Sequence, residues 1–207
     1  MSEVSAKNKT IARAALEAFG AEPNVSGGAK PNVSRYWDEK NESFVDILVC
    51  QNRPSNAVQS VSTIGLSDHP LFEGGVEYRD GDGYLVRPEI VGACYKEVKE
   101  FPNILSTAAF CVINSKWFCA PGAIFPDVVK MYLPRIRTKH LMFYPPFLWE
   151  ERLMTIQFDK LKVAWLMAVP ISESEYRFAV DNTWHELGDL FAEQEIDVFD
   201  LNRKSVV

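Results

Sequence analysis

The sequence predicts an α+β fold, a single-domain α/β sandwich in which a mixed or antiparallel sheet packs against helices. Two runs, Leu141–Tyr144 and Val163–Val169, are apolar at every position, which is typical of central strands covered on both faces. Helical patterns lie near both ends of the chain. At 207 residues and 47% apolar composition, the chain is long enough for one sizeable core and short for two domains. We therefore expect residues 1–207 to form one domain.

The first predicted helix covers about residues 8–19. Gly20 suits the left-handed position that follows the last turn of a helix. Two loops, residues 22–31 and 73–83, are rich in glycine and polar residues and are predicted to lie on the surface. The apolar stripe of the helix consists of Ile11, Ala12, Ala15, Leu16 and Phe19.

Residues 44–169 contain the predicted sheet and one buried helix. Phe44–Cys50 and Val58–Leu66 are rich in β-forming residues, and the polar turn between them indicates two neighbouring strands. A further strand is predicted at Tyr84–Tyr95. Pro88 within this run favours an edge strand or a bend, because proline has no N–H to donate to a sheet.

The buried helix is predicted at Asn103–Phe118. Its apolar residues recur at nearly helical spacing from Leu105 to Trp117. The segment Ala120–Asp127 has the pattern of a turn and a short extended piece. It leads into the central strands.

A long final helix is predicted from Glu173 to about Glu193, followed by a tail at residues 194–207. Ser172 is placed as its N-cap, and Glu175 three residues later completes a capping box. Ile171 can pack against the fourth helical residue, which would secure the start of the helix. The predicted apolar face of this helix comprises Tyr176, Ala179, Val180, Thr183, Leu187, Leu190 and Phe191.

The excess negative charge lies on this last helix and the segment after it. Residues 172–200 carry nine acidic and one basic side chain, whereas residues 1–171 carry 19 of each sign. Because nucleic-acid binding needs positive charge to neutralise phosphates, direct binding to DNA or RNA is not expected. The simplest explanation of the acidic face is a solvated helix surface. Its carboxylates are Glu186, Asp189, Glu193 and Glu195.

The chain carries no pattern typical of a metal or cofactor site. Its four cysteines, which lie in apolar strings, are expected to be buried reduced thiols, and a disulfide between Cys111 and Cys119 would need an oxidising compartment. No apolar run approaches 18 residues, and the first ten residues lack a signal-peptide pattern. We therefore expect a cytoplasmic protein without a membrane span. The four cysteines of the chain are Cys50, Cys94, Cys111 and Cys119.

Ser67-Asp68-His69 contains the three residue types of a hydrolase triad. Neighbours in sequence cannot normally form that relay, because the histidine must lie between the other two side chains in space. A turn is therefore favoured. A hydrolase that uses Ser67, Asp68 and a distant histidine is the weaker alternative, and the sequence lacks the usual nucleophile elbow.

The remaining polar groups are also explained without catalysis. Glu150 and Glu151 are adjacent, so on regular structure their carboxylates point apart and cannot share one substrate. His140 and His185 are single histidines near aromatic residues and are expected to be partnered boundary groups. Gly81-Asp82-Gly83 is predicted to be a turn. We expect a protein that is not an enzyme.

Taken together, several short motifs resemble the Suppressor of fused domain family, in its bacterial form. Each motif alone is weak, but five occur in order over nearly the whole chain. The motifs are Ile64–Pro70, Arg87 with Glu89–Gly92, Phe143–Glu150, Val169–Glu173 with Glu175, and Asp200–Ser205. The resemblance implies an α/β sandwich-like domain that holds a protein partner and has no catalytic residue to carry over.

The resemblance also implies two functions. Small bacterial members resemble immunity proteins, or antitoxins, which neutralise a secreted toxin that is often a nuclease. An acidic face could meet the basic surface of such a toxin, so Glu186, Asp189, Glu193 and Glu195 are the predicted contacts. The alternative is a regulatory protein-interaction module that sequesters a peptide, with an apolar groove near Tyr144–Trp149.

Overall fold

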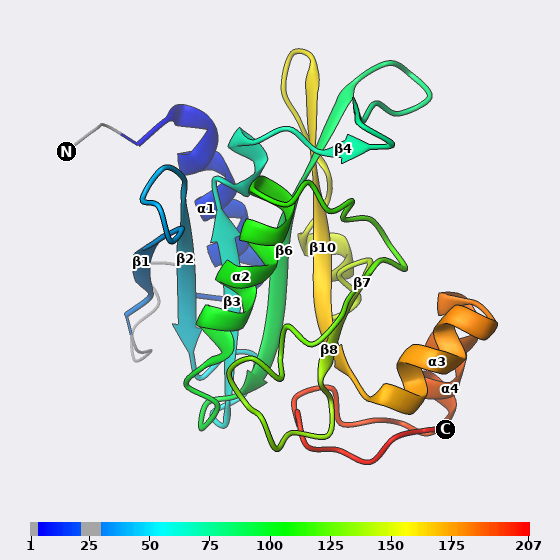
Figure 1. Cartoon of the computed structure of the whole chain (residues 1–207). Helices are drawn as coiled ribbons and strands as arrows, with labels where there is room; N and C mark the ends of the chain where they lie inside the picture. Colours follow the sequence, from blue (N-terminus) through cyan, green and yellow to red (C-terminus); the bar gives the residue numbers. More distant parts are fainter. Residues whose placement is uncertain (1–3, 22–29) are drawn as a thin grey trace.

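The computed structural model describes residues 4–21 and 30–207, which form a mixed sheet of eight strands with helices on both faces (Figure 1). The strand order is β1-β2-β3-β6-β10-β8-β7, and β9 pairs with β10. The β6–β10 pair is parallel and the other pairs are antiparallel. The strands are β1 (Asn32–Trp37), β2 (Phe44–Gln51), β3 (Val58–Ile64), β6 (Leu85–Tyr95), β7 (Ile124–Phe125), β8 (His140–Tyr144), β9 (Ile156–Gln157) and β10 (Leu161–Ile171). The predicted α+β class is confirmed.

The helices occupy different faces of this sheet. Those in the described ranges are α1 (Ala6–Ala18), α2 (Phe101–Ile113), α3 (Glu173–Asp181) and α4 (Trp184–Glu193). One core lies between α2 and the sheet, where Phe143 packs with the helix residue Leu105. The other core lies on the opposite face and includes Met142 of β8, Ile11 of α1 and Leu187 of α4. No described helix is long and apolar enough to cross a membrane.

The central strands are apolar on both sides because both faces are covered. All five residues of β8 are buried, and alternate residues belong to the two cores. In β10 the same alternation sends Leu166 to the α2 core and Met167 to the α1 core. The sequence-based prediction of two interior strands is therefore confirmed.

The first helix is also as predicted. α1 begins at Ala6, where the Ser5 side chain accepts a hydrogen bond from the Asn8 N–H. It ends just before Gly20, which adopts φ +64° as a left-handed cap. The following strand, β1, is absent from the sequence-based prediction, because an edge strand alternates polar and apolar residues only weakly here.

The position of β6 corrects the expectation drawn from Pro88. β6 lies in the interior of the sheet, between β3 and β10, and is not an edge strand. However, β3 pairs with β6 only from Val91 to Tyr95. At Pro88 the ladder continues only on the β10 side, opposite Ala164. The missing N–H of the proline therefore leaves no gap in the β3 ladder.

Two loop predictions have different outcomes. The predicted loop at 73–83 contains the turn of a small hairpin, formed by β4 (Phe72–Glu73) and β5 (Val76–Glu77). Gly74 and Gly75 both have positive φ, as a tight two-residue hairpin turn requires. Most of the predicted loop at 22–31 lies outside the described residues.

The buried helix is present but shorter than predicted. α2 ends at Ile113 rather than Phe118, and Trp117 lies beyond its end. The indole of Trp117 is partly exposed and stacks edge-on against Phe125 of β7. Trp117 therefore packs against β7, although it lies outside the helix.

The predicted long final helix is two helices. The chain leaves helical geometry at Asn182, and Thr183 is extended at φ −133° and ψ 158°. The Thr183 hydroxyl accepts a hydrogen bond from the Glu186 N–H, 3.2 Å away, and so caps α4. The break turns Val180 towards solvent, whereas Leu187 is buried as predicted.

The start of α3 is held by a buried ion pair. The predicted capping box is confirmed, since Ser172 and Glu175 bond each other's backbone N–H groups. Glu175 is fully buried, and its Oε1 also lies 2.6 Å from Nη1 of Arg203 in the C-terminal tail. Arg203 donates further to the carbonyl of Pro170, at the end of β10. The sheet, the helix and the tail thus meet at one carboxylate.

Replacing Arg203 by methionine should destabilise the protein strongly. The change leaves Glu175 buried without its cation, and breaking a buried pair in this way costs about 3–5 kcal/mol. Urea unfolding followed by circular dichroism measures the change. The control is Arg177→Met, which removes an exposed pair with Glu173 and should change the free energy of unfolding by less than ~0.5 kcal/mol. Similar losses for the two variants would contradict the prediction.

Candidate functional site

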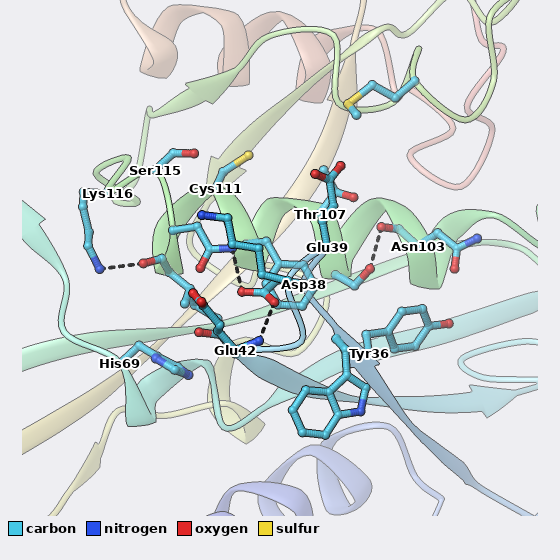
Figure 2. Close-up of a pocket in the computed structure, with 18 of the residues that line it drawn as sticks. Tyr36, Asp38, Glu39, Glu42, His69, Asn103, Thr107, Cys111, Ser115 and Lys116 are labelled. Carbon is cyan, nitrogen blue, oxygen red and sulfur yellow. Dashed lines mark hydrogen bonds between the residues drawn. The ribbon is translucent and has the colours of Figure 1, made fainter.

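A cleft lies between the β1–β2 hairpin and the outer side of α2 (Figure 2). Its volume is about 750 Å³, within the range of small-ligand and peptide-anchor pockets. One wall is the hairpin segment 36–43, and the other is the helix from Asn103 to Asn114. Met131 and Tyr132 close one end. We refer to it as the hairpin–helix cleft.

The hairpin wall of the cleft is organised by Asp38. Its N–H donates to the Ser43 carbonyl, and its carboxylate accepts from the Glu42 N–H at 2.9 Å. The Asn114 side-chain amide reaches across from the end of α2 to the same carboxylate, at 3.2 Å. Desolvation works against these hydrogen bonds, but together the bonds lower the pKa of Asp38 below its usual value. The two walls are therefore joined at one point.

The side chains that face the cleft do not form a nucleophilic centre. Cys111 is the thiol on its wall, and burial raises the pKa of that thiol to about 11, so it stays protonated at neutral pH. Thr107 and Tyr132 are hydrogen-bonded to each other through their hydroxyls at 2.6 Å. Neither the Cys111 thiol nor the paired hydroxyls of Thr107 and Tyr132 are therefore activated nucleophiles.

The four cysteines are free thiols, as predicted. Burial raises the pKa of Cys50 and of Cys94 to about 12, and raises the pKa of Cys119 well above its usual value. No group of three or more metal-ligating side chains occurs among the described residues.

The acidic residues proposed from sequence lie on the solvent side of α4. Glu186, Asp189 and Glu193 are exposed and are spaced three and four residues apart, so they share one face of the helix. Glu195 follows the helix and is also exposed. Within the described residues no ion pair joins any of the four to a cation. These four residues are called the acidic face below.

The groove suggested near Tyr144–Trp149 is largely filled. Tyr144 and Trp149 are buried in the α1 core, and Trp149 packs on the ring of Phe19 at 4.8 Å. Phe147 is the exposed large apolar side chain of this run. The segment therefore contributes mainly to the core.

The two histidines differ in their surroundings. His140 is buried in β8, where Nδ1 accepts from the Asp127 N–H and Nε2 lies 3.1 Å from the Glu173 carboxylate. Because Nδ1 accepts a hydrogen bond, Nε2 is the ring nitrogen that can donate to Glu173. The hydrogen bond from His140 lowers the pKa of Glu173. His185 is exposed and stacks on Trp184 at 3.6 Å.

Ser67 and Glu89 form a buried structural contact. Ser67 lies in a short 3₁₀ turn, Leu66–Asp68, and its hydroxyl donates to Glu89 at 2.8 Å and accepts from the Lys7 ammonium at 3.0 Å. Glu89 also accepts from the N–H groups of Gly65 and Ser67, and from the hydroxyl of Thr63. The Ser67 hydroxyl is therefore occupied in holding this turn, as the turn interpretation predicts.

The remaining sequence candidates also lie in turns. Glu150 and Glu151 belong to an exposed 3₁₀ turn that ends at Arg152. Asp80 and Asp82 flank Gly81 and both pair with Lys162 of β10, at 2.5 and 3.2 Å. The carboxylates of Asp80 and Asp82 therefore converge on one position, which the Lys162 ammonium occupies.

Comparison with known proteins identifies the family. The model of the family described as Suppressor of fused protein (SUFU) matches residues 41–204. The chain is 44% identical over 204 residues to the protein named Immunity protein YqcF of Bacillus subtilis strain 168, and the match covers 99% of both chains. The chain therefore belongs to the Suppressor of fused family.

Solved structures share the fold at low sequence identity. A Suppressor of fused homologue from Neisseria gonorrhoeae FA 1090 aligns with a TM-score of 0.68 and 16% identity over 97% of both chains. A structure of the Sufu–Fu complex aligns with a TM-score of 0.61 and 16% identity, over 97% of this chain and 92% of the matched one. Drosophila Suppressor of Fused aligns at 0.60 and 14% identity, and there the match spans 51% of that chain.

Glu89→Gln should change how stability depends on pH. Burial raises the pKa of Glu89 above its usual value, because desolvation outweighs the four hydrogen bonds to the carboxylate. A raised pKa in the folded state stabilises the fold fully below the unfolded pKa, near 4.5, and this contribution is lost as pH rises through the folded pKa.

The free energy of unfolding of the wild type, minus that of Glu89→Gln, should therefore fall above about pH 4.5, by up to ~1.4 kcal/mol per pH unit. Urea titrations between pH 4 and 8 measure this difference. Taking the difference between the two free energies of unfolding removes the contributions of the carboxylates that both proteins share. A difference that stays constant over this range would contradict a raised pKa for Glu89.

Proposed function

We propose that this member of the Suppressor of fused family is an immunity protein that binds and neutralises a cognate protein toxin. The observation that carries the proposal is the 44% identity to Immunity protein YqcF over almost the full length of both chains. A match that spans both chains from end to end supports a common type of partner more strongly than a shared fold does. The toxin itself is to be identified by experiment.

The acidic face is proposed as the toxin-binding surface. Its carboxylates are exposed and lack cationic partners within the described residues, so they are available to an incoming cation. A nuclease must attract phosphate groups with lysine and arginine, and an inhibitor that presents carboxylates meets the same surface. Opposite charge also accelerates association by electrostatic steering. These considerations favour a nuclease as the toxin.

The proposed action is non-catalytic and takes place in the cytoplasm, where such a toxin would otherwise act on the cell. It requires only occlusion of the toxin surface. His140, the cysteines and the Ser67 hydroxyl each have an alternative structural explanation in the surroundings described above. Binding without turnover is therefore the simplest mechanism.

Co-expression tests the function directly. The protein is produced in a host together with the product of the gene beside its own, and growth and co-purification are measured. Rescue of growth with a stable complex is expected, because a bound toxin cannot reach its substrate. Rescue without a complex would point to an indirect effect. A non-toxic neighbour with no complex would favour the regulatory-module alternative.

Reversing two charges tests the acidic face. Asp189→Lys with Glu193→Lys should weaken toxin binding roughly tenfold or more and flatten its salt dependence, because two favourable charges become repulsive. Titration calorimetry at 50 and 300 mM salt measures both effects. The matched control is Glu150→Lys with Glu151→Lys, an equal charge change on an exposed turn beside α1. Unchanged affinity and salt dependence for the α4 variant would remove the acidic face from the interface.

A further inference from the structure

We infer that the hairpin–helix cleft binds an arginine side chain presented by a protein partner. The inference rests on the proposed function only for the identity of that partner, the toxin. The cleft is a different surface from the acidic face, and its chemistry is a property of this chain alone. It would give the complex a specific anchor in addition to long-range charge attraction.

The cleft is formed before any ligand arrives. The hairpin turn is closed by the Asp38 N–H bond to Ser43 and by the Glu42 N–H bond to the Asp38 carboxylate. The Asn114 side-chain amide then links this turn to the end of α2 through its hydrogen bond to Asp38. A pocket whose walls are already held in place loses little conformational entropy when it is filled. The size of the cleft, about 750 Å³, exceeds that of one side chain and leaves space for neighbouring backbone.

Apolar and aromatic side chains supply part of the lining. Tyr36 and Trp37 come from the end of β1, and Phe110 comes from α2. Trp37 is 49% exposed and is held by the ring of Phe44 at 5.1 Å. Met131, at the closed end, is 66% exposed. An exposed indole ring and an exposed thioether side chain beside a hollow favour a ligand with an apolar stem or a flat cation.

The charged residues of the lining carry a net negative charge, because the three carboxylates of Asp38, Glu39 and Glu42 face two lysines, Lys40 and Lys116. The hydrogen bonds of Asp38 stay within the protein, whereas Glu39 and Glu42 are exposed and have no ion pair to a described cation. Of the two lysines in the lining, Lys116 donates to the Ile113 carbonyl at 2.6 Å and is thereby held at the end of α2. Lys40 is exposed in the hairpin turn.

Arginine matches this combination better than the other side chains. Its three-carbon stem can lie along the apolar lining, and its guanidinium can stack on an aromatic ring while donating two hydrogen bonds to a carboxylate. An acidic side chain would meet the carboxylates of Glu39 and Glu42. A wholly apolar side chain would desolvate those carboxylates without providing a partner.

The test uses the full chain and three matched peptides. The first is acetyl-Gly-Leu-Arg-Leu-Gly-amide, the second replaces arginine by neutral citrulline, and the third replaces it by glutamate. Binding is followed by shifts of backbone amide signals in ¹⁵N-labelled protein. The arginine peptide should shift amides of the hairpin segment 36–43 and of α2. The citrulline peptide should bind roughly tenfold more weakly, and the glutamate peptide should show no saturable shifts.

Two variants with the same loss of charge locate the site. Glu39→Gln with Glu42→Gln should weaken the arginine peptide roughly tenfold, because both unpaired carboxylates of the cleft are removed. Asp189→Asn with Glu193→Gln should leave the dissociation constant within about twofold, since these residues lie on α4. Shifts that map to α4, equal binding of the citrulline peptide, or no effect of the cleft variant would each overturn the inference.

The two proposals fail in different ways. Growth rescue in co-expression with no arginine-dependent shifts in the cleft would overturn the inference about the cleft and leave the immunity function intact. Arginine-dependent binding in the cleft without growth rescue would support the cleft as a binding site and count against the toxin as its partner.

Discussion

The buried pair between Glu175 and Arg203 determines where the chain from residue 170 onwards lies. The carboxylate accepts from the N–H of Ser172 at the start of α3 and from the N–H of Val206 in the tail. The guanidinium bonds the carbonyl of Pro170 and lies over the ring of Phe191 in α4, at 4.8 Å. One pair thus joins the end of β10, both C-terminal helices and the tail. Because both groups are desolvated, removing either one leaves the other as a buried charge without a partner.

The sheet supplies the second constraint. Strands β6, β10 and β8 are apolar on both faces, so a helix layer is needed on each side, and α2 and α1 provide these layers. Glu89, on β6, is an ionisable group buried within the sheet, and four hydrogen bonds from Thr63, Gly65 and Ser67 offset part of its desolvation. The motifs that resemble the Suppressor of fused family therefore coincide with contacts that hold the fold together.

The two surfaces proposed for binding lie towards opposite ends of the sheet. The hairpin–helix cleft adjoins β1 at one edge, whereas α3 and α4 lie beyond β8 on the other side in Figure 1. Substitutions at the two surfaces share no partner and are expected to act independently. Because the two surfaces are separate, the contribution of each one to toxin binding can be measured with variants of that surface alone. The separation also allows one partner to contact both, if it is large enough to extend across the sheet.

The sequence by itself determined the features that arise between near neighbours. The apolar runs of β8 and β10, the stripe of α1 ending at Gly20, and the capping box at Ser172 all follow from periodicities and capping rules that span a few residues. The start of α4 also has residues suited to capping, Thr183 and Glu186. In the sequence these two residues lie within a continuous helical pattern, so the break before α4 was not predicted.

Only the tertiary structure decided the contacts between distant residues. Asp38 with Asn114, Glu89 with Ser67, and Glu175 with Arg203 are 76, 22 and 28 residues apart in the chain. The interior place of the β6 strand likewise depended on where its neighbour β3 stops pairing, near Val91. Periodicity reports which side of an element is buried, but not which distant group will compensate a buried charge or close a cleft. That choice is made when the elements pack, because burial then makes each unpaired polar group costly.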